Sequence, residues 1–401
     1  MTLVTRLTAS LVPLVLSGVV LGALAALRGE VWPRFVPPSL GISITLFVGW
    51  VLLRGPWPGS GIEALVDAIT LLFYVTLVVA ALAYANCVQP LHSEAERAWF
   101  SFATLALAVM VFGHVATDQW VAKLLHNWLP ILRSSGARNL VVDGNVVALN
   151  DSEINRQVVL LTLWAWPVWL MARNWRSPWS LLVSGALLVA VAIVVAYARS
   201  ETAKLALAVG AVLYVLHWWR PWVGLVTALT GWTVAVFLVI PLSIAVHDLE
   251  MHKSERLFYT ARARVVVWNS VAKKVLERPV VGHGLQSMRA HYYAEGSAGA
   301  REVDPETQLP TGAAHAHNVY LQVWYEFGGI GAALLGAFGY AVLLTLWRLP
   351  PQLRSVGLAH AGVIAGVMAT GYGIWQPWLQ AGTAYSIFLL LRAGVPHPVA
   401  R

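Results

Sequence analysis

Two histidines lie close together where a polar segment of the chain meets a long apolar run. They are His315 and His317, and Asn318 follows directly. An imidazole has an unperturbed pKa of about 6.5, so beside a membrane surface it can accept a proton near neutral pH. Residue type leaves three interpretations of His317: a general base, a metal ligand together with His315, or a solvated side chain at a helix start. A metal would need further ligands, and no spacing supports the available ones, His283, His291, Asp304 and Glu306.

Arg199 is a charged residue in a very tight turn between two apolar runs, the second of which begins at Ala203. An arginine so close to hydrocarbon needs a partner or an anionic ligand. Glu201 is the ordinary partner, and snorkelling of the side chain to the interface is a second alternative.

Arg262 and Arg264 precede Trp268 in a segment with helical spacing. Positions two apart point to different sides of a helix, so we expect only one of the two arginines to face a site. Arg264 and Trp268 share a face, which also fits a surface arginine stacked on an indole. A planar guanidinium suits phosphate oxygens and keeps its charge. Two arginines and a base near an outer membrane surface suggest a lipid pyrophosphate with a hydroxyl attacking beside it.

Polar residues inside apolar runs give weaker signals. Glu326, nine residues after His317, is either a buried hydrogen-bonding residue or part of a relay. Glu63, Asp67 and His114 would suit a proton path in a transporter, although single intramembrane polar residues do not establish one. Three glycines are expected to permit close helix packing: Gly328, Gly331 and Gly336.

The elements that position these residues must lie in a membrane. Apolar residues make up 58% of the 401 and charged ones only 11%, against about 25% charged in an ordinary soluble domain. This composition excludes a soluble globular enzyme, a coiled coil, a collagen and a disordered tail. The net charge of +8 is explained by basic loops on one side of a membrane, and no nucleic-acid-binding motif accompanies it. The single cysteine, Cys87, excludes an internal disulfide and a cysteine-based metal site.

Apolar runs recur along the whole chain, and a transmembrane helix needs roughly 20 such residues. We therefore expect an all-α polytopic membrane protein with about 11–12 transmembrane helices. The runs are Thr8–Leu27, Pro38–Leu53, Ile62–Ala85, Trp99–Ala116, Gln157–Ala172, Pro178–Ala198, Ala203–Trp219, Trp222–Val246, Val319–Trp347, Val356–Tyr372 and Trp378–Leu391.

Basic residues cluster in the short loops after Ala172, Trp219 and Trp347 and in the tail, which the positive-inside rule places in the cytoplasm. The turn at Arg199 and the two long connections then lie outside. Eleven runs put the N-terminus outside, whereas Arg6 favours the inside, so a total of twelve would resolve the conflict. We expect N-terminal helices in residues 1–246 with an outer loop at 118–156, a large outer loop at 247–318, and C-terminal helices with a tail at 319–401.

Both long outer segments are expected to contain regular structure. Residues 140–147 have the pattern of a β-hairpin with an Asp-Gly turn. Ser254–Glu277 has helical spacing of apolar residues, ends before Pro279, and is followed by a turn at Gly282 and Gly284.

These motifs resemble those of bacterial O-antigen ligases. His317-Asn318, nine residues and Gly328-Gly329-Ile330-Gly331 are similar to the family pattern His-Asn/Ser/Gln-x9-Gly-x-x-Gly. Arg264 to Trp268, with the later Pro279-Val280-Val281-Gly282-His283-Gly284, resembles its Arg-x3-Trp … Pro-x-x-Gly-x-Gly stretch. Arg199-Ser200 looks like its Ser-Arg turn, except that serine follows arginine here. The resemblance covers residues 197–340, and its superfamily also contains O-antigen polymerases and protein O-oligosaccharyltransferases.

The resemblance implies a multispan enzyme of GT-C-like architecture in the bacterial inner membrane, with a large periplasmic loop over the active site. It would transfer O-antigen polysaccharide from undecaprenyl pyrophosphate to a sugar of lipid A-core. His317 would be the general base, and Arg199 and Arg264 would hold the pyrophosphate. His315, Asn318 and Trp268 are supporting candidates. Because His315 and His317 are only two residues apart, either histidine could be the base.

No metal or other cofactor is implied, because the leaving pyrophosphate provides the driving force. The sequence also lacks an acidic pair expected for Mg²⁺, and two guanidinium groups can stabilise the developing charge instead. A polymerase or protein-glycosylating relative would differ only in its acceptor. A lipid-linked glycan transporter is the second rival, although paired broken helices and symmetric halves are not evident.

Overall fold

The computed structural model of the chain describes residues 37–54, 62, 64, 66–76, 94–128, 140–149, 151–294 and 303–393. The first expected run, Thr8–Leu27, lies outside these residues, as do Arg6, Glu63 and Cys87. The description therefore begins with the second run.

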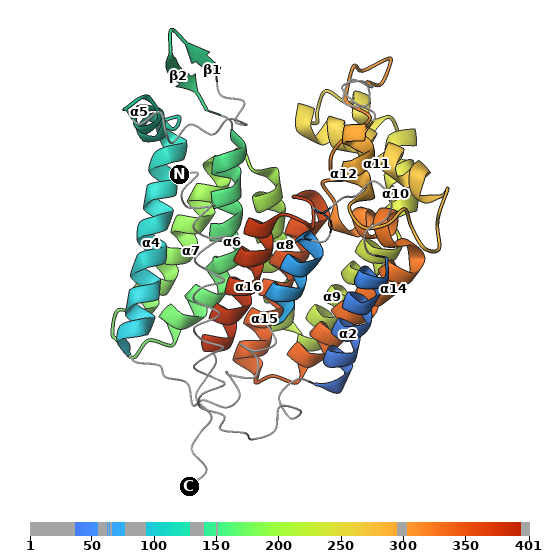
Figure 1. Cartoon of the computed structure of the whole chain (residues 1–401). Coiled ribbons are helices and arrows are strands. Elements are labelled where there is room, and N and C mark those ends of the chain that lie inside the picture. The colour runs from blue at the N-terminus through green and yellow to red at the C-terminus, as the bar shows by residue number, and fades with distance from the viewer. Residues whose placement is uncertain are drawn as a thin grey trace.

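Long helices run between the two ends of the molecule and form its main body (Figure 1). Their bounds are α2 Pro38–Leu53, α4 Glu94–Ala116, α6 Asp151–Arg173, α7 Ser180–Tyr197, α8 Glu201–Trp219, α9 Pro221–Phe237, α10 Val239–Asp248, α14 Val319–Trp347, α15 Pro351–Thr370 and α16 Pro377–Arg392. A shorter apolar helix spans Val66–Thr76. The runs expected at Pro38–Leu53 and Val319–Trp347 agree with α2 and α14 at both ends.

The protein is an all-α polytopic membrane protein. Within the described residues, five helices are long and apolar enough to cross a membrane, or six if the bent pair α9–α10 is one span. In α7, Leu187 and Val191 are buried, whereas Leu182 and Val189 on other faces are 63% and 58% exposed. Such exposed leucine and valine suit lipid contact rather than water. The total of 11–12 helices stays a prediction.

The run expected at Trp222–Val246 contains a break between two helices, α9 and α10. The axes of α9 and α10 differ by 72° across a break at Leu238. Pro241 explains the break, because its ring has no N–H to donate to the carbonyl of Phe237 and would clash with that carbonyl. Proline is tolerated in the first turn of the new helix.

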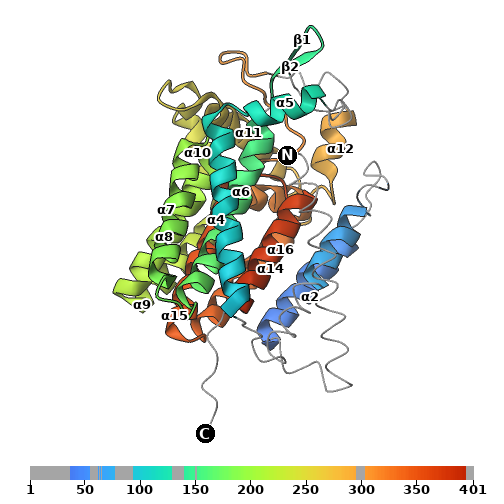
Figure 2. The same cartoon turned by 90° about the vertical axis from the view of Figure 1, so that its left-hand side faces the viewer.

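Polar segments cap one end of the bundle, which we call the cap end. It holds α5 (Trp120–Trp128), the hairpin β1 (Leu140–Val142) and β2 (Asn145–Ala148), the 3₁₀ helix η3 (Met251–Lys253), α11 (Tyr259–Val275) and α12 (Ser287–Ala294). Figure 2 shows α5 and the hairpin above α4 and α6. The expected hairpin is confirmed, with positive φ at Asp143 and Gly144 in its turn.

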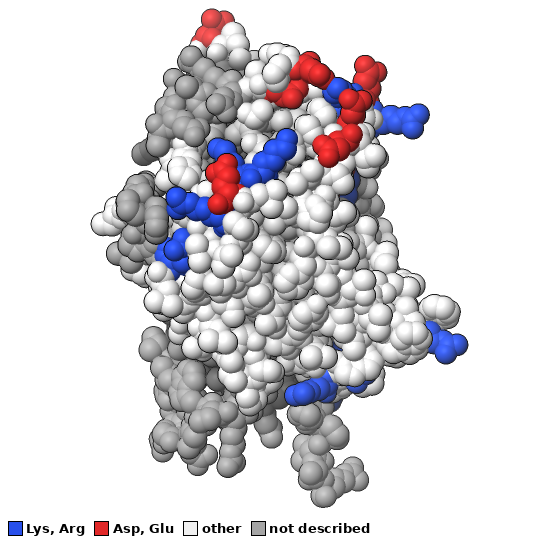
Figure 3. All heavy atoms as spheres, turned by 90° about the vertical axis from the view of Figure 1, so that its right-hand side faces the viewer, with Lys and Arg blue, Asp and Glu red and all other residues white. Residues whose placement is uncertain are grey.

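The opposite end, which we call the loop end, carries short connections. Arg173 and Arg176 lie between α6 and α7, Arg220 between α8 and α9, and Arg348 and Arg354 near the α14–α15 connection. On the face drawn in Figure 3, charged side chains gather toward both ends, and a broad uncharged band separates them. The basic short loops are therefore all on one side, as the positive-inside rule requires of a membrane protein.

A kink divides α14 and attaches the cap end to the bundle. Gly328 has φ 66° and ψ −164°, which only glycine adopts easily. At this point the loop from Pro279 to Gly284 packs main chain against main chain, and an added Cβ on Gly328 would lie 2.3 Å from the Val280 oxygen. Four backbone hydrogen bonds join the two segments: His283 N to Tyr325 O, Gly284 N to Glu326 O, Gly329 N to Pro279 O and Ile330 N to Val280 O.

The expected role of the three glycines is therefore partly wrong. Gly328 serves a loop contact and not helix packing, because its backbone leaves the helical region. Gly336 does allow helix packing, since an added Cβ would lie 2.7 Å from the ring of Phe237 in α9.

Candidate active site

His317 occupies a strained backbone position at the start of α14. Its φ is 53°, a left-handed conformation in which histidine is uncommon but tolerated. Asn318 follows in extended conformation and caps the helix, since its side-chain oxygen accepts a hydrogen bond from Leu321 N at 3.0 Å. The cap fixes where the helix begins, and the left-handed residue before it turns the imidazole toward α15.

The hydrogen bond of His317 determines which nitrogen carries the proton. Nδ1 lies 3.1 Å from the carbonyl oxygen of Gly371, just past the end of α15. A carbonyl can only accept, so Nδ1 donates and Nε2 keeps its lone pair in the neutral ring. Burial, and next the charge of Arg264, lower the pKa of His317 to about 4. The ring is therefore neutral at pH 7.

His315 lies beside His317 but its Nε2 is already engaged. The two ring centroids are 4.1 Å apart, and Gln376 Nε2 lies 3.3 Å from His315 Nε2. Trp378 Nε1, which can only donate, bonds to Gln376 Oε1 at 2.7 Å. This contact turns the amide so that Gln376 donates to His315. Burial, with the charge of His317 next, lowers the pKa of His315 to about 3.

α11 brings Arg264 and Trp268 to the two histidines. The Trp268 indole donates to the carbonyl of Ala316, between the histidines, at 2.8 Å. Arg264, one turn earlier on α11, is close enough for its charge to lower the pKa of both imidazoles. Burial lowers the pKa of Arg264 itself, yet a guanidinium stays charged in proteins. In the described part of the chain, no carboxylate forms an ion pair with Arg264.

The helix α11 is held against α14 by its apolar face. Val267 and Val271 are buried in one cluster with Tyr320 and Val323 of α14. The predicted helix at Ser254–Glu277 is thus confirmed with shorter bounds, and its burial explains why Arg264 reaches the start of α14.

Arg199 lies exposed at the turn between α7 and α8, at the same cap end. Its charge acts on Asp118, which follows α4. Glu201, two residues later, forms an ion pair with Lys204 at 2.8 Å and also acts electrostatically on Arg264. The structure thus brings together His315, His317, Arg264 and Trp268, whereas the charge of Arg199 acts on Asp118, outside this group.

Sequence reasoning missed the residues that orient the histidines. Gly371, Gln376 and Trp378 lie in or beside the connection between α15 and α16. Arg156 in α6 was included in an outer loop, yet its charge lowers the pKa of His315 and its guanidinium lies 5.8 Å from the Trp378 ring centroid. The available signal in the sequence was Gln376, a polar residue between two apolar runs.

Glu326 is the acceptor of a buried hydrogen-bond network below the histidines. Its side chain has no exposed surface. Oε1 accepts from Gln322 Nε2 at 2.9 Å, and Oε2 accepts from Trp375 Nε1 at 2.7 Å and Gln286 N at 3.2 Å. Gln322 Oε1 in turn accepts from Ile374 N. The carboxylate therefore joins the cap end, α14 and the α15–α16 connection.

Among the described residues, no third potential metal ligand lies beside the pair His315 and His317. Within the described residues, the single group of three or more His, Cys, Asp or Glu side chains that could hold an ion lies elsewhere, at His247, His252 and Asp304. His283 instead stacks on Tyr325 with ring centroids 4.6 Å apart.

Comparison with known proteins identifies the region that contains this site. Residues 184–336 match the family described as O-antigen ligase. This part of the chain is similar to O-antigen ligases. The matched region includes Arg199, Arg264, His317 and Glu326, so the resemblance inferred from the motifs is confirmed.

Curated relatives of the O-antigen ligase domain point to the same family. A protein of Rickettsia conorii named "Putative polysaccharide ligase" is 26% identical over 244 residues, which are 59% of this chain and 57% of the relative. A protein of the same description from Rickettsia prowazekii is 29% identical over 122 residues, 30% of this chain and 29% of the relative. The chain thus matches little more than half of the first relative's length.

Proposed function

We propose that the protein transfers O-antigen polysaccharide from undecaprenyl pyrophosphate to a sugar hydroxyl of lipid A-core. The reaction is an inverting, metal-independent glycosyl transfer in the bacterial inner membrane, with the cap end facing the periplasm. The observation that carries the proposal is the neutral imidazole of His317, which is subject to the charge of Arg264, a partly buried arginine without an ion-pair partner in the described residues.

His317 is the general base in this reaction. Its Nδ1 donates to Gly371, so Nε2 is available to take the proton of the acceptor hydroxyl. His315 is less suited, because its Nε2 already accepts from Gln376. His315 instead packs against the base, and Trp268 and Asn318 hold the main chain on either side of it.

Arg264 and Arg199 receive the pyrophosphate. The acceptor oxygen attacks the anomeric carbon while Nε2 takes its proton, and the bond from that carbon to the pyrophosphate oxygen breaks on the opposite face. The electron pair leaves with the pyrophosphate, whose growing negative charge the guanidinium groups stabilise. Arg264 suits this role because it is partly buried and lacks an ion-pair partner in the described residues. Arg199 is exposed in the turn between α7 and α8 at the cap end, which makes it the candidate for the first contact with the pyrophosphate of the carrier lipid.

The test is transfer by the purified protein in detergent, with lipid-linked polysaccharide and lipid A-core as substrates. We expect His317→Ala to lower the rate about 10²- to 10⁴-fold, which is the usual contribution of a general base. His291→Ala, which removes another cap-end histidine, is the matched control and should keep near-normal activity. Equal activity of the His317 and His291 variants would refute the proposed base.

The same assay separates the alternatives. A transporter needs a sealed compartment, so transfer in detergent excludes it. A polymerase or protein O-oligosaccharyltransferase would accept a second lipid-linked unit or a protein in place of lipid A-core. In cells, loss of a ligase leaves bare core with polymer on its carrier, whereas loss of a polymerase leaves core with one unit.

A further inference from the structure

Two histidines and an aspartate converge at the cap end, on segments far apart in the sequence. His247 lies in the last turn of α10, His252 in η3, and Asp304 in a loop that precedes the histidines of the active site. Their potential ligand atoms all lie within 4.8 Å of one another. In the described residues, no other histidine, cysteine or carboxylate group meets this condition as a set of three.

The buried histidine of this group lacks a partner for one nitrogen. His252 is 4% exposed, and its Nδ1 is buried without a hydrogen-bond partner among the described residues. Leaving such an atom unpaired costs free energy, so a buried unpaired nitrogen calls for a partner such as a bound water or ion. The histidine therefore points to a bound species that supplies the missing contact.

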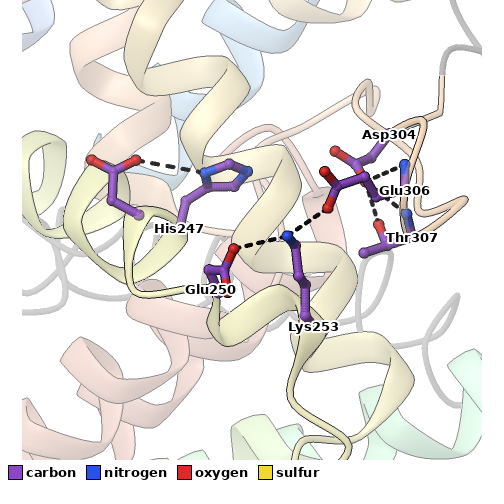
Figure 4. A network of polar contacts seen from close by, with 7 residues as sticks. His247, Glu250, Lys253, Asp304, Glu306 and Thr307 are labelled. Atoms are coloured by element: carbon purple, nitrogen blue, oxygen red, sulfur yellow. Dashed lines mark hydrogen bonds and ion pairs between the residues drawn. The ribbon is translucent and has the colours of Figure 1, made fainter.

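Asp304 also retains a free oxygen within the described part of the chain. Its Oδ1 accepts from Thr307 N at 2.8 Å, from Thr307 Oγ1 at 2.7 Å and from Glu306 N at 3.2 Å. Oδ2 takes part in none of these bonds. Figure 4 shows Asp304 with Thr307 and Glu306, near His247. One oxygen thus fixes the carboxylate in its loop, and the other can bind a cation.

The charges around the three residues favour a cation. Lys273 is close enough for its charge to act on His247. Lys253 forms ion pairs with Glu250 at 2.8 Å and Glu306 at 2.5 Å, which offset its charge (Figure 4). The carboxylate of Asp248 lies 3.8 Å from His247 Nδ1. A carboxylate in that position can orient a ligating imidazole, as is common around metal-bound histidines.

We propose that His247, His252 and Asp304 bind a divalent transition-metal ion, with zinc as the natural occupant. Two imidazoles and one carboxylate are a ligand set that zinc accepts, with water as the fourth ligand of a tetrahedral site. The two rings now lie parallel, with centroids 4.2 Å apart and an angle of 3°. Zinc–nitrogen distances of about 2.0–2.1 Å require the ligand atoms to move closer together. Side-chain rotations that tilt the rings toward Asp304 would achieve this.

The consequence is a link between distant parts of the cap. The metal would join the end of α10 and η3 to the loop that contains Asp304. The segment after Asp304 leads directly to His315 and His317. Binding would therefore restrain the segment that leads into the proposed active site. Metal binding does not depend on the proposed glycosyl transfer, so its test requires no activity assay.

The experiment is zinc titration of the full-length protein, purified in detergent and freed of metal with a chelator. Isothermal calorimetry should show one site in the wild type, and cobalt in place of zinc should give visible absorption bands of a tetrahedral site. Asp304→Asn and His247→Ala should each weaken binding at least about tenfold, since even residues that only support ligands contribute this much. Asp304→Asn keeps Oδ1 and hence the contacts to Thr307, so it should still fold.

Glu306→Gln is the matched control, because it removes a carboxylate from the same loop that is not a proposed ligand. It should retain the zinc site. Zinc should raise the melting temperature of the wild type and of this control, but not of Asp304→Asn, because only a folded site that binds the metal is stabilised. Absence of zinc binding in the wild type overturns the proposal. So does binding that is unchanged in Asp304→Asn and His247→Ala, or that is lost only in His315→Ala.

Discussion

The acid limb of the pH–rate profile should lie far below the ordinary range of histidine. The free His317 imidazole must be neutral to act as a base, and burial together with the Arg264 charge lowers its pKa to about 4. At pH 5.5, a group with a pKa of about 4 is about 97% deprotonated, whereas an ordinary histidine is only about 10% deprotonated. We therefore expect kcat/KM to stay nearly constant from pH 7 to pH 5.5 and to fall about tenfold per unit below pH 4.

The comparison of kcat with kcat/KM tests the electrostatic part of this reasoning. The kcat/KM profile reports the free enzyme, and the kcat profile reports the enzyme–substrate complex. A bound pyrophosphate offsets the positive charge of Arg264, so the pKa of His317 should be higher in the complex. The acid limb of kcat should thus lie at higher pH than that of kcat/KM. Arg264→Gln should raise the kcat/KM limb for the same reason.

The assay is transfer by purified protein between pH 3.5 and 8, with each point corrected for the fraction that stays folded. A kcat/KM limb at about pH 6.5 that does not move in Arg264→Gln would refute the account of a partly buried base beside a partly buried cation. A profile unchanged by His317→Gln would refute the assignment of the base.

Three further changes test the geometry. Arg264→Lys should lower transfer about 10- to 100-fold, because an ammonium keeps the charge but loses the two-pronged contact with phosphate; activity equal to the wild type would contradict this contact. Gly328→Ala should destabilise the protein by more than the roughly 1–3 kcal/mol of backbone strain, because its Cβ would also meet a carbonyl oxygen 2.3 Å away. Gly185→Ala, where a Cβ meets nothing within 4 Å, should leave the melting temperature in detergent unchanged or raised. Glu326→Gln should cost about 1–3 kcal/mol of unfolding free energy, since an amide cannot accept from all three donors, Trp375 included; an unchanged melting temperature would show that the network adapts.

The membrane helices could be predicted from the sequence because hydropathy is a local property. α2 and α14 begin and end where the apolar runs do. The same property cannot show a break inside a run, so α9 and α10 were joined although Pro241 lay within them. Hydropathy also does not distinguish a glycine that contacts a helix from one that contacts a loop, and Gly328 was misassigned for this reason.

The site residues could be predicted as types but not as an arrangement. His317 and Arg264 carry recognisable chemistry and lie in family motifs. The residues that orient the histidines are far from them in the sequence. The carbonyl of Gly371 is 54 residues from His317, and Gln376 is 61 residues from His315. Only the fold could show which imidazole nitrogen is engaged. The roles of these residues in transfer stay predictions.

The junction between the cap end and α14 is made of main-chain atoms. Gly282 and Gly328 approach each other without side chains, and the bonds across them join amides to carbonyls. Substitution of neighbouring side chains leaves these main-chain hydrogen bonds intact, as long as both glycines remain. The side chains on the surface of the cap can therefore change while the main-chain junction keeps the cap in the same position relative to α14.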